Sequence, residues 1–358
     1  MGKSAHSAKW KKTLLVCVAV ILSFALVVMP ATTVIIYESI FSFRYETPSW
    51  LRYSASDFEG LTVQRSDFVS NDGALLAGYC YARPGAETKG VVVFAHGHGG
   101  GGHNAYMPII DYLTTRGYLV FAYDAHGNDN SAGDDTVGLP QGVIDLDYAI
   151  RHIKSLDAYA GLPILLLGHS WGAYSAASVL SMHSDVQAAV LISGFNESED
   201  LLLHQSRQYV GVLADITASY VFLYEELKFG SHYADASALQ GISDSSAKVL
   251  VVHSRDDTNV PIEYGYGKLQ AAFGQTDRVE FIQYESRGHG YVFCSDDAIR
   301  YQAALAAQYA DYVDANGGDD NARVKETFML SNMDKDRFFE LDMALMERIV
   351  ALYDEVCL

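Results

Sequence analysis

The sequence predicts an α/β protein with a mainly parallel sheet, and three observations lead to that prediction. Apolar runs typical of buried strands alternate with helical patterns between residues 91 and 193, as βαβ units require. Before them, two alternating stretches flank Asn71-Asp72-Gly73, which is a strong hairpin signal. A strand, a glycine-flanked serine and a helix then follow one another at 163–178. With 358 residues, 49% of them hydrophobic, the chain can bury a core of this size.

The elements are expected in the following order. The hairpin strands are 61–69 and 74–82, the antiparallel start of the sheet. After them come strand 91–95, helix 104–116, strand 118–123, helix 141–155, strand 163–168, helix 171–183 and strand 187–193, and then two later strands at 248–253 and 279–284.

The C-terminal part is expected to be helical. A helix at 298–313 and a polar break at 314–321 precede an amphipathic helix from about 334 to 356. The last helix carries an apolar stripe, which predicts that it packs on the body, while a partner-binding or membrane-surface helix is the alternative. The stripe consists of Phe338, Leu341, Leu345, Ile349 and Leu352.

The stretch between the strands at 193 and 248 is too long for an ordinary connection in a compact fold. Its apolar residues recur at roughly helical spacing, so we expect a helical cap inserted at about 196–247. These residues either line a binding site or pin the cap to the body, and the sequence favours neither interpretation.

A candidate nucleophile lies in the run Gly168–Gly172, G-H-S-W-G, between an apolar strand and a helix of small residues. A serine held in a strained turn between strand and helix needs neighbours without a Cβ, and glycine supplies them on both sides. The pattern predicts that Ser170 is a nucleophile whose hydroxyl projects over a helix N-terminus, where an oxyanion is stabilised.

The expected partners of such a serine follow it in the order acid, then histidine. His289 is the only histidine beyond residue 253, and it lies in a glycine-flanked loop after the strand at 279–284. The strand at 248–253 is followed by Asp256 and Asp257. We favour Asp257 because it begins an Asp-x-x-Val-Pro turn, with Asp256 as the alternative.

An oxyanion pocket is expected after the strand at 91–95, where H-G-H-G-G-G-G at 96–102 forms a loop almost free of side chains. The predicted donors are the backbone N–H groups of His98 and Trp171. A phosphate-binding loop is disfavoured, because the Gly-Lys-Ser/Thr ending and the dinucleotide spacing are both missing. No metal or cofactor is expected, since His96, His98 and His103 have no nearby Cys, Asp or Glu in the loop.

These motifs together resemble the α/β-hydrolase superfamily, most closely its bacterial serine-aminopeptidase-like and monoacylglycerol-lipase-like hydrolases. The resemblance covers about residues 60 to 315 and includes the segment 123–131, which departs from the usual form by lacking the Arg before His-Gly and the second Gly before Ser. It implies an eight-stranded, mostly parallel sheet with helices on both faces and an acyl-transfer reaction at the C-terminal edge of the strands.

The N-terminus predicts a membrane anchor. Residues 1–12 are basic, and residues 13–37 contain no charge over 25 residues. Such a helix would extend about 37 Å, enough to cross a hydrocarbon core of about 30 Å. Lysines before it and Glu38 after it predict a cytoplasmic N-terminus, a linker at 38–60 and an extracytoplasmic hydrolase domain at 61–358. A cleaved signal peptide is the competing interpretation.

The charge balance restricts the partners. Without the four N-terminal lysines, 21 basic residues face 44 acidic ones, which argues against nucleic acid as a partner. Cys80, Cys294 and Cys357 are expected to be free, mostly buried thiols.

The sequence therefore predicts a membrane-anchored serine hydrolase that acts on a small-molecule or lipid-like acyl substrate. Carboxylic esters are favoured, with amides or peptides next. An acyltransferase with the same triad is one alternative, and a noncatalytic membrane-tethered binding domain is another.

Overall fold

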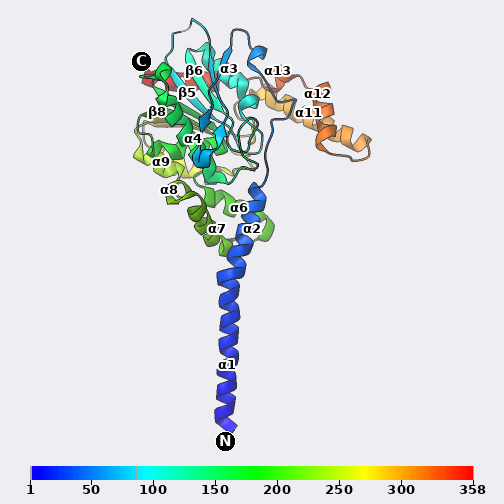
Figure 1. The fold of residues 1–358 in the computed structure, drawn as a ribbon. Helices are drawn as coiled ribbons and strands as arrows, with labels where there is room; N and C mark the ends of the chain where they lie inside the picture. The colour runs from blue at the N-terminus through cyan, green and yellow to red at the C-terminus, as the bar shows by residue number, and fades with distance from the viewer. Residues whose placement is uncertain (1, 86, 358) are drawn as a thin grey trace.

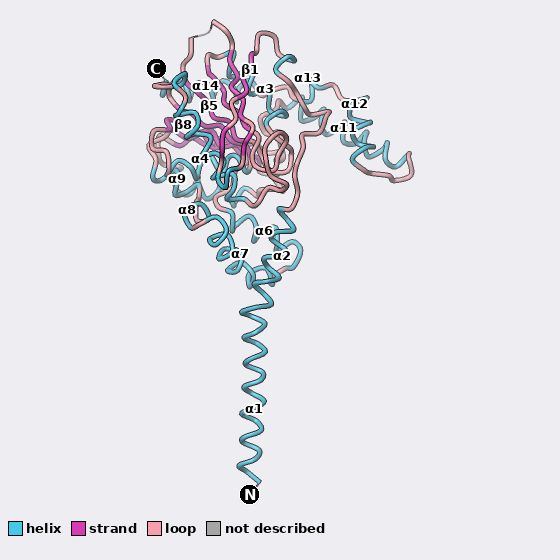
Figure 2. Tube along the Cα trace, in the orientation of Figure 1, coloured by secondary structure: helices cyan, strands magenta, loops and turns pink. Residues whose placement is uncertain are grey.

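The computed structural model describes residues 2–85 and 87–357, and its centre is an eight-stranded sheet (Figures 1 and 2). The strands are β1 (Thr62–Arg65), β4 (Gly78–Ala82), β5 (Gly90–Ala95), β6 (Tyr118–Tyr123), β7 (Ile164–His169), β8 (Val186–Ile192), β9 (Lys248–Ser254) and β10 (Val279–Tyr284). They lie in the order β1-β4-β6-β5-β7-β8-β9-β10. β4 is antiparallel to both neighbours, and the six strands from β6 to β10 run parallel. The predicted mostly parallel, eight-stranded sheet is confirmed.

The predicted hairpin is present, but each of its two long strands is interrupted. A separate two-stranded ribbon, β2 (Phe68–Val69) and β3 (Leu75–Leu76), continues the register of β1 and β4 beyond a break. Phe68 leaves the main sheet because its ring is buried and stacks on His152, with centroids 5.5 Å apart.

Helices cover both faces of the sheet, as predicted. One face carries α4 (Leu139–Ser155), α5 (Trp171–Ser178), α9 (Ala238–Asp244) and α10 (Tyr266–Phe273), and the other carries α3 (Met107–Thr115), α11 (Asp296–Ala315) and α14 (Met343–Cys357). β5 shows how the alternation of a strand builds two cores: Val91 and Val93 pack in the first, whereas Val92 and Phe94 pack in the second.

The single helix predicted for 334–356 is wrong. The chain forms α13 (Lys335–Phe338) and then α14, and between them Leu341 pairs with Cys294. A further helix, α12 (Ala322–Asn332), precedes them and was not predicted. The expected packing on the body is confirmed by Leu345, Ile349 and Leu352, which are buried in the second core.

The insertion between β8 and β9 is a helical cap made of α6 (Ser198–Val210), α7 (Leu213–Phe229) and α8 (Ser231–Ala234), with α9 returning to the body. Leu201 and Leu202 are buried and pin the cap to the body. Val212 and Leu223 lie outward, with 78% and 51% of their surface exposed. The cap is at the end of the body from which the N-terminal helix emerges (Figure 1).

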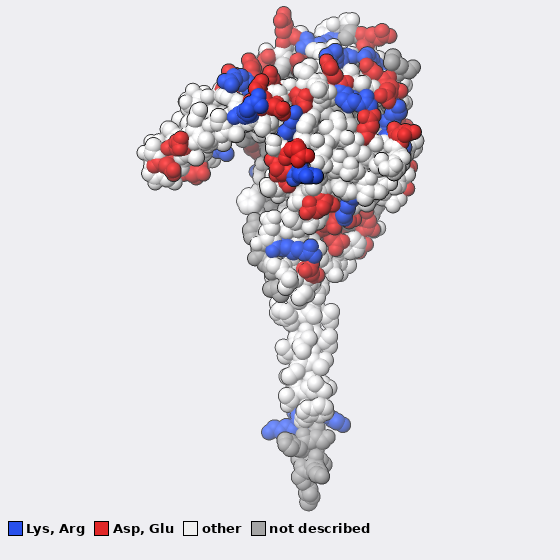
Figure 3. Space-filling view, turned by 180° about the vertical axis from the view of Figure 1, so that it is seen from behind, with Lys and Arg blue, Asp and Glu red and all other residues white. Residues whose placement is uncertain are grey.

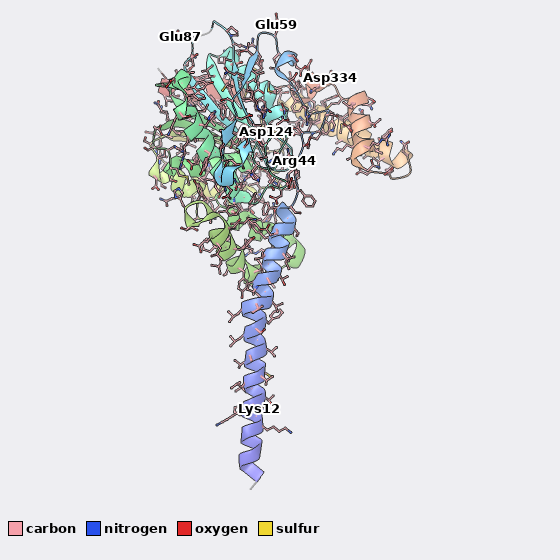
Figure 4. The ribbon with its side chains drawn as sticks, in the orientation of Figure 1. Lys12, Arg44, Glu59, Glu87, Asp124 and Asp334 are labelled. Atoms are coloured by element: carbon pink, nitrogen blue, oxygen red, sulfur yellow. The ribbon has the colours of Figure 1, made fainter. Side chains whose placement is uncertain are left out.

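The N-terminus forms one continuous helix: α1 (Gly2–Ser23), a π-helical turn at Phe24–Val28 and α2 (Met29–Phe41). Within it, Lys9–Phe41 is long and apolar enough to cross a membrane. Lys12 lies near the basic end of this helix. No charged side chain lies on the helix between that end and the body of the protein (Figures 3 and 4).

The residues expected to form a linker are ordered and packed. Helix α2 continues four residues beyond the predicted end of the anchor, to Phe41. The segment after it crosses the body: Tyr45 N–H donates to Gly127 O at 3.0 Å, and Leu51 and Tyr53 are buried. All four cysteines are free.

Candidate active site

Ser170 lies in a strained turn between β7 and α5. Its φ is 55° and its ψ is −116°, a conformation that L-residues rarely adopt. The turn excludes side chains on both sides: a Cβ on Gly168 would lie 2.2 Å from Gly172 O, and a Cβ on Gly172 would lie 2.0 Å from Ala95 O. Both glycines of the motif are therefore sterically required.

The structure brings Ser170, His289 and Asp257 together from three different loops. Ser170 Oγ lies 2.8 Å from His289 Nε2, and His289 Nδ1 lies 2.7 Å from Asp257 Oδ2. The loops follow β7, β9 and β10, so the three side chains meet at the C-terminal edge of the parallel sheet. With Nδ1 donating to the carboxylate, Nε2 is left to accept the hydroxyl proton.

The Asp257 carboxylate is held in its charged form. Burial alone would raise its pKa, but hydrogen bonds from His253 and His289, the charge of His289 and the N–H of Val260 together keep that pKa well below its usual range. Oδ1 accepts the N–H groups of Asn259 and Val260, both at 2.9 Å. The acid is thus fixed in position as well as charged.

Asp256, the alternative acid, makes different contacts. Its Oδ1 accepts Ser254 Oγ at 2.6 Å and the N–H of Gly288 at 2.9 Å. It therefore holds the backbone of the loop that carries His289, while Asp257 contacts the imidazole itself.

The glycine loop after β5 lies beside Ser170. A Cβ on Gly97 would come within 3.5 Å of Ser170 Cβ. Among the described residues, no protein group accepts the backbone N–H of His98 or of Trp171. The two N–H groups predicted as oxyanion donors are therefore free to bind a substrate oxygen. The Trp171 ring is held in place by a separate hydrogen bond, from Nε1 to Leu139 O at 2.7 Å.

The segment that follows α2 and carries Thr47 supports this glycine loop. A Cβ on Gly101, whose φ is +86°, would lie 2.1 Å from Thr47 N. Thr47 Oγ1 accepts the N–H of Gly102 at 3.0 Å and donates to Asp129 Oδ2 at 2.6 Å. The chain just after α2 therefore packs directly against the loop.

The His98 side chain joins the same contacts. Its ring centroid lies 5.8 Å from that of Phe41, 5.1 Å from that of Tyr45 and 5.4 Å from that of Trp171. Nε2 contacts Thr136 Oγ1 at 3.0 Å. Burial and the nearby His96 lower the pKa of His98 to about 4, so the imidazole is neutral at physiological pH.

His169 has no predicted role at the site, but the structure gives its side chain two hydrogen bonds there. Its Nε2 lies 2.9 Å from His289 O, and its Nδ1 lies 2.9 Å from Tyr106 OH. Tyr106 OH also accepts the N–H of Gly97 at 3.3 Å. Burial, followed by the charge of His289, lowers the pKa of His169 to about 3. A polar residue inside the nucleophile turn was the available signal for His169, whereas nothing in the sequence singles out Tyr106.

The remaining histidines of the glycine loop have protein partners. His96 accepts the N–H of Ala125 at 2.9 Å and contacts Gly97 O at 2.8 Å, and His103 lies 2.7 Å from both Asp124 Oδ1 and Tyr81 OH. Over residues 2–85 and 87–357, no group of three His, Cys, Asp or Glu side chains could hold a metal ion. The two rings instead hold the loop against its neighbours.

Comparison with known proteins gives matches of one kind. The family model described as serine aminopeptidase, S33, matches residues 86–236. The uncharacterized protein YfhR of Escherichia coli K12 is 22% identical over 243 residues, which cover 65% of this chain and 78% of YfhR. The human monoglyceride lipase is 35% identical over 107 residues, 29% of this chain and 34% of the lipase.

Solved structures share the fold. The Pyrococcus furiosus esterase Pf2001 aligns with a TM-score of 0.54 at 17% identity, over 76% of this chain and 98% of the esterase. The Pyrococcus horikoshii acylaminoacyl peptidase aligns with a TM-score of 0.50 at 17% identity, over 66% of this chain and 39% of the peptidase. At such low identity these similarities establish the architecture alone.

Proposed function

Because the chain belongs to the α/β-hydrolase superfamily and is a serine hydrolase, we propose that it cleaves carboxylic esters, or amides, through an acyl-enzyme formed on Ser170. One observation carries the proposal: the unbroken hydrogen-bond chain from Ser170 Oγ through His289 to Asp257, with contacts of 2.8 and 2.7 Å. This order of nucleophile, base and acid is the arrangement that activates a serine hydroxyl.

The proposed reaction has two halves. Ser170 Oγ attacks the acyl carbon while His289 Nε2 takes the hydroxyl proton, and Asp257 stabilises the resulting imidazolium. The C–O or C–N bond of the substrate then breaks, and the leaving group takes the proton from Nε2. Water attacks the acyl-serine with the same base, which releases the acid and restores Ser170. None of these steps uses a cofactor.

The negative charge of the tetrahedral intermediate would be held by the backbone N–H groups of His98 and Trp171. The N-terminus of α5 adds a favourable dipole at the same place. Removing one such donor in other enzymes costs about 3 kcal/mol of transition-state stabilisation. Since these donors are backbone groups, the position of the glycine loop controls the contribution of His98, and the start of α5 controls that of Trp171.

The substrate class is proposed from the relatives. A monoglyceride lipase and an esterase, both named for ester cleavage, point to a small-molecule or lipid-like ester, and an acylaminoacyl peptidase makes amides the second choice. The acidic surface of the body is consistent with an uncharged or weakly charged acyl substrate.

Membrane anchoring belongs to the same proposal. Lysines at the start of the apolar helix favour a cytoplasmic N-terminus and an extracytoplasmic hydrolase domain. Retention of the helix is supported by its contacts with the cap, because Tyr220 OH donates to Ala25 O at 2.8 Å. Cleavage near Met29-Pro30-Ala31, the competing interpretation, would remove this contact.

The test is labelling of the purified full-length protein with a fluorophosphonate probe, together with hydrolysis of p-nitrophenyl acetate. Wild type should be labelled and active, and Ser170→Ala should lose both properties. Ser178→Ala is the matched control, since Ser178 is buried on the same helix and its Oγ has no recorded partner among the described residues. Full esterase activity in Ser170→Ala, or an unlabelled wild type, would overturn the assignment. Product analysis with added alcohols separates hydrolysis from acyl transfer.

A further inference from the structure

The cap and the apolar N-terminal helix are packed along each other. Tyr220 on α7 donates to Ala25 O at 2.8 Å, and Tyr37 donates to Glu225 Oε1 at 2.7 Å. Between these contacts Thr33 is buried, and at their upper end Tyr224 and Lys228 both bind Glu38. Helix α7 therefore follows the N-terminal helix from Ala25 up to Glu38.

This contact begins below the expected outer surface of the bilayer. Lys12 is the last charged residue before Glu38, so it marks the inner boundary of the apolar span. Ala25 lies 13 residues further along, which corresponds to about 20 Å of helix. The hydrocarbon core is about 30 Å thick. With the lysine at the inner boundary, the level of Ala25 is inside the outer leaflet, and tilt of the helix lowers it further.

The part of the cap at this level is apolar and exposed. Val212 at the α6–α7 turn and Ile216 on the first turns of α7 are 78% and 54% exposed. Leu223 and Leu227 continue the exposed side of α7 toward the body, at 51% and 78%. We call these four residues the apolar cap face.

The nearest charges at the tip neutralise each other. Arg207 on α6 and Asp215 on α7 form an ion pair across the turn. Pairing leaves the tip without net charge, and this lowers the cost of bringing it near the acyl chains. The tip thus has the composition of an interfacial helix pair.

The catalytic edge of the body faces the same way. Ser170 follows the C-terminal end of β7, and the neighbouring strand β8 runs from its own C-terminal end into α6. The cap is in turn at the end from which the N-terminal helix leaves the body (Figure 1). The bilayer, the cap and the C-terminal edge of the sheet therefore lie on one side of the molecule.

We propose that the apolar cap face is inserted in the outer leaflet of the membrane, so that Ser170 acts on amphiphilic esters resident in that leaflet. The occupant of this surface is lipid hydrocarbon, and the hydrogen bonds of α7 to the N-terminal helix fix the depth of the surface. The inference rests on the proposed serine hydrolase function and on anchoring by the N-terminal helix.

Insertion is tested without reference to activity in full-length protein reconstituted in phosphatidylcholine nanodiscs. Val212→Trp adds one tryptophan to the three native ones. Its emission should be quenched, relative to wild type, when the lipid acyl chains are brominated. Leu330→Trp is the control, because Leu330 is 61% exposed on α12, outside the cap. Equal quenching increments for the two variants, or none for Val212→Trp, would overturn insertion.

The functional consequence is tested with two substrates. The double variant Val212→Asp, Ile216→Asp should hydrolyse 1-oleoylglycerol in phosphatidylcholine vesicles at least 10-fold more slowly than wild type, with the rate on p-nitrophenyl acetate unchanged within twofold. Leu330→Asp should keep both rates. Unchanged hydrolysis of the vesicle substrate by the double variant would overturn the proposed route, whereas a wild type inactive on the soluble ester would overturn the proposed function instead. A loss on both substrates together would indicate damage to the fold, and the quenching result would then decide.

Discussion

His169 and His289 are joined by a hydrogen bond from the ring of the first to the backbone of the second, with Nε2 of His169 2.9 Å from His289 O. The side chain next to the nucleophile thereby holds the loop that carries the base. Since the other ring nitrogen accepts from Tyr106, whose hydroxyl accepts the N–H of Gly97, the connection extends to the glycine loop. The His289 loop and the glycine loop, which carry the proposed base and one proposed oxyanion donor, are thus connected through one neutral imidazole.

Tyr106→Phe should therefore slow catalysis without abolishing it. The change removes the donor to His169 Nδ1 and the acceptor for Gly97 N–H. A net hydrogen bond contributes about 1 kcal/mol, so kcat on p-nitrophenyl acetate should fall about 5- to 10-fold with KM nearly unchanged. Tyr112→Phe is the control, because the buried hydroxyl of Tyr112 has no recorded partner in the described part of the chain. Equal kcat values for the two variants would contradict this positioning role.

The two adjacent aspartates should differ sharply. Asp257→Asn removes the charge that stabilises the protonated His289 and permits the wrong tautomer, so kcat should fall on the order of 10³- to 10⁴-fold. Asp256→Asn weakens the contacts to Ser254 and Gly288 and should cost less than about 10-fold. Steady-state kinetics with a soluble ester measures both. A larger loss for Asp256→Asn would reverse the assignment of the acid.

The glycine loop offers a matched pair for stability. Gly101→Ala places a Cβ 2.1 Å from Thr47 N at a φ of +86°, whereas a Cβ on Gly100 meets nothing within 4 Å. The first change should lower the free energy of unfolding by about 3 kcal/mol or more, through backbone strain and displacement of the segment that carries Thr47. Gly100→Ala should stay within about 0.5 kcal/mol of wild type. Thermal unfolding of the two variants in detergent compares them directly, and similar midpoints would refute the close packing of Thr47.

Stability should also depend on pH through Glu225. Burial raises the pKa of this carboxyl to about 7 against the lowering effect of hydrogen bonds from Tyr37 and Ser198. The folded chain then binds the proton more tightly than the unfolded chain. The stabilisation is complete below about pH 4.5 and is lost as pH rises through about 7, with a span of about 3 kcal/mol.

Glu225→Gln copies the protonated form and should remove this dependence. Melting temperatures at pH 5 and pH 8 should converge in Glu225→Gln but remain separated in wild type and in the neighbouring Glu226→Gln. A pH dependence that persists in Glu225→Gln would assign the effect to another group.

The core of the fold was predictable because each of its strands carries its own signal. The strand predicted at 279–284 coincides with β10, and the turn at Ser170 was predicted from its glycines and flanking elements. The candidate triad could also be predicted, because the expected order of serine, acid and histidine along the chain leaves few candidates. The structure places Ser170, Asp257 and His289 within hydrogen-bond reach of one another.

What the sequence could not predict depends on tertiary contacts. No glycine or proline interrupts residues 334–356, so the sequence carries no local signal for the break between α13 and α14, where Leu341 pairs with Cys294. Helix α12 did have a local signal in the sequence, namely its N-cap residue Asn321. The Asn321 side chain accepts the N–H groups of Arg323 and Val324. The contact of Thr47 with Gly102 joins positions 55 apart and leaves no local pattern.

The packing of Phe41, Tyr45 and Thr47 around the glycine loop has a consequence for forms of this protein that are shortened at the N-terminus. The conformation of the glycine loop is thermodynamically linked to the segment that follows α2, as it would be to a bound ligand. A body released by cutting before residue 48 would leave the His98 ring without two of its three aromatic neighbours and Gly102 without its acceptor in Thr47. Truncation there would therefore disturb the glycine loop beside Ser170 even though Ser170, Asp257 and His289 would all remain.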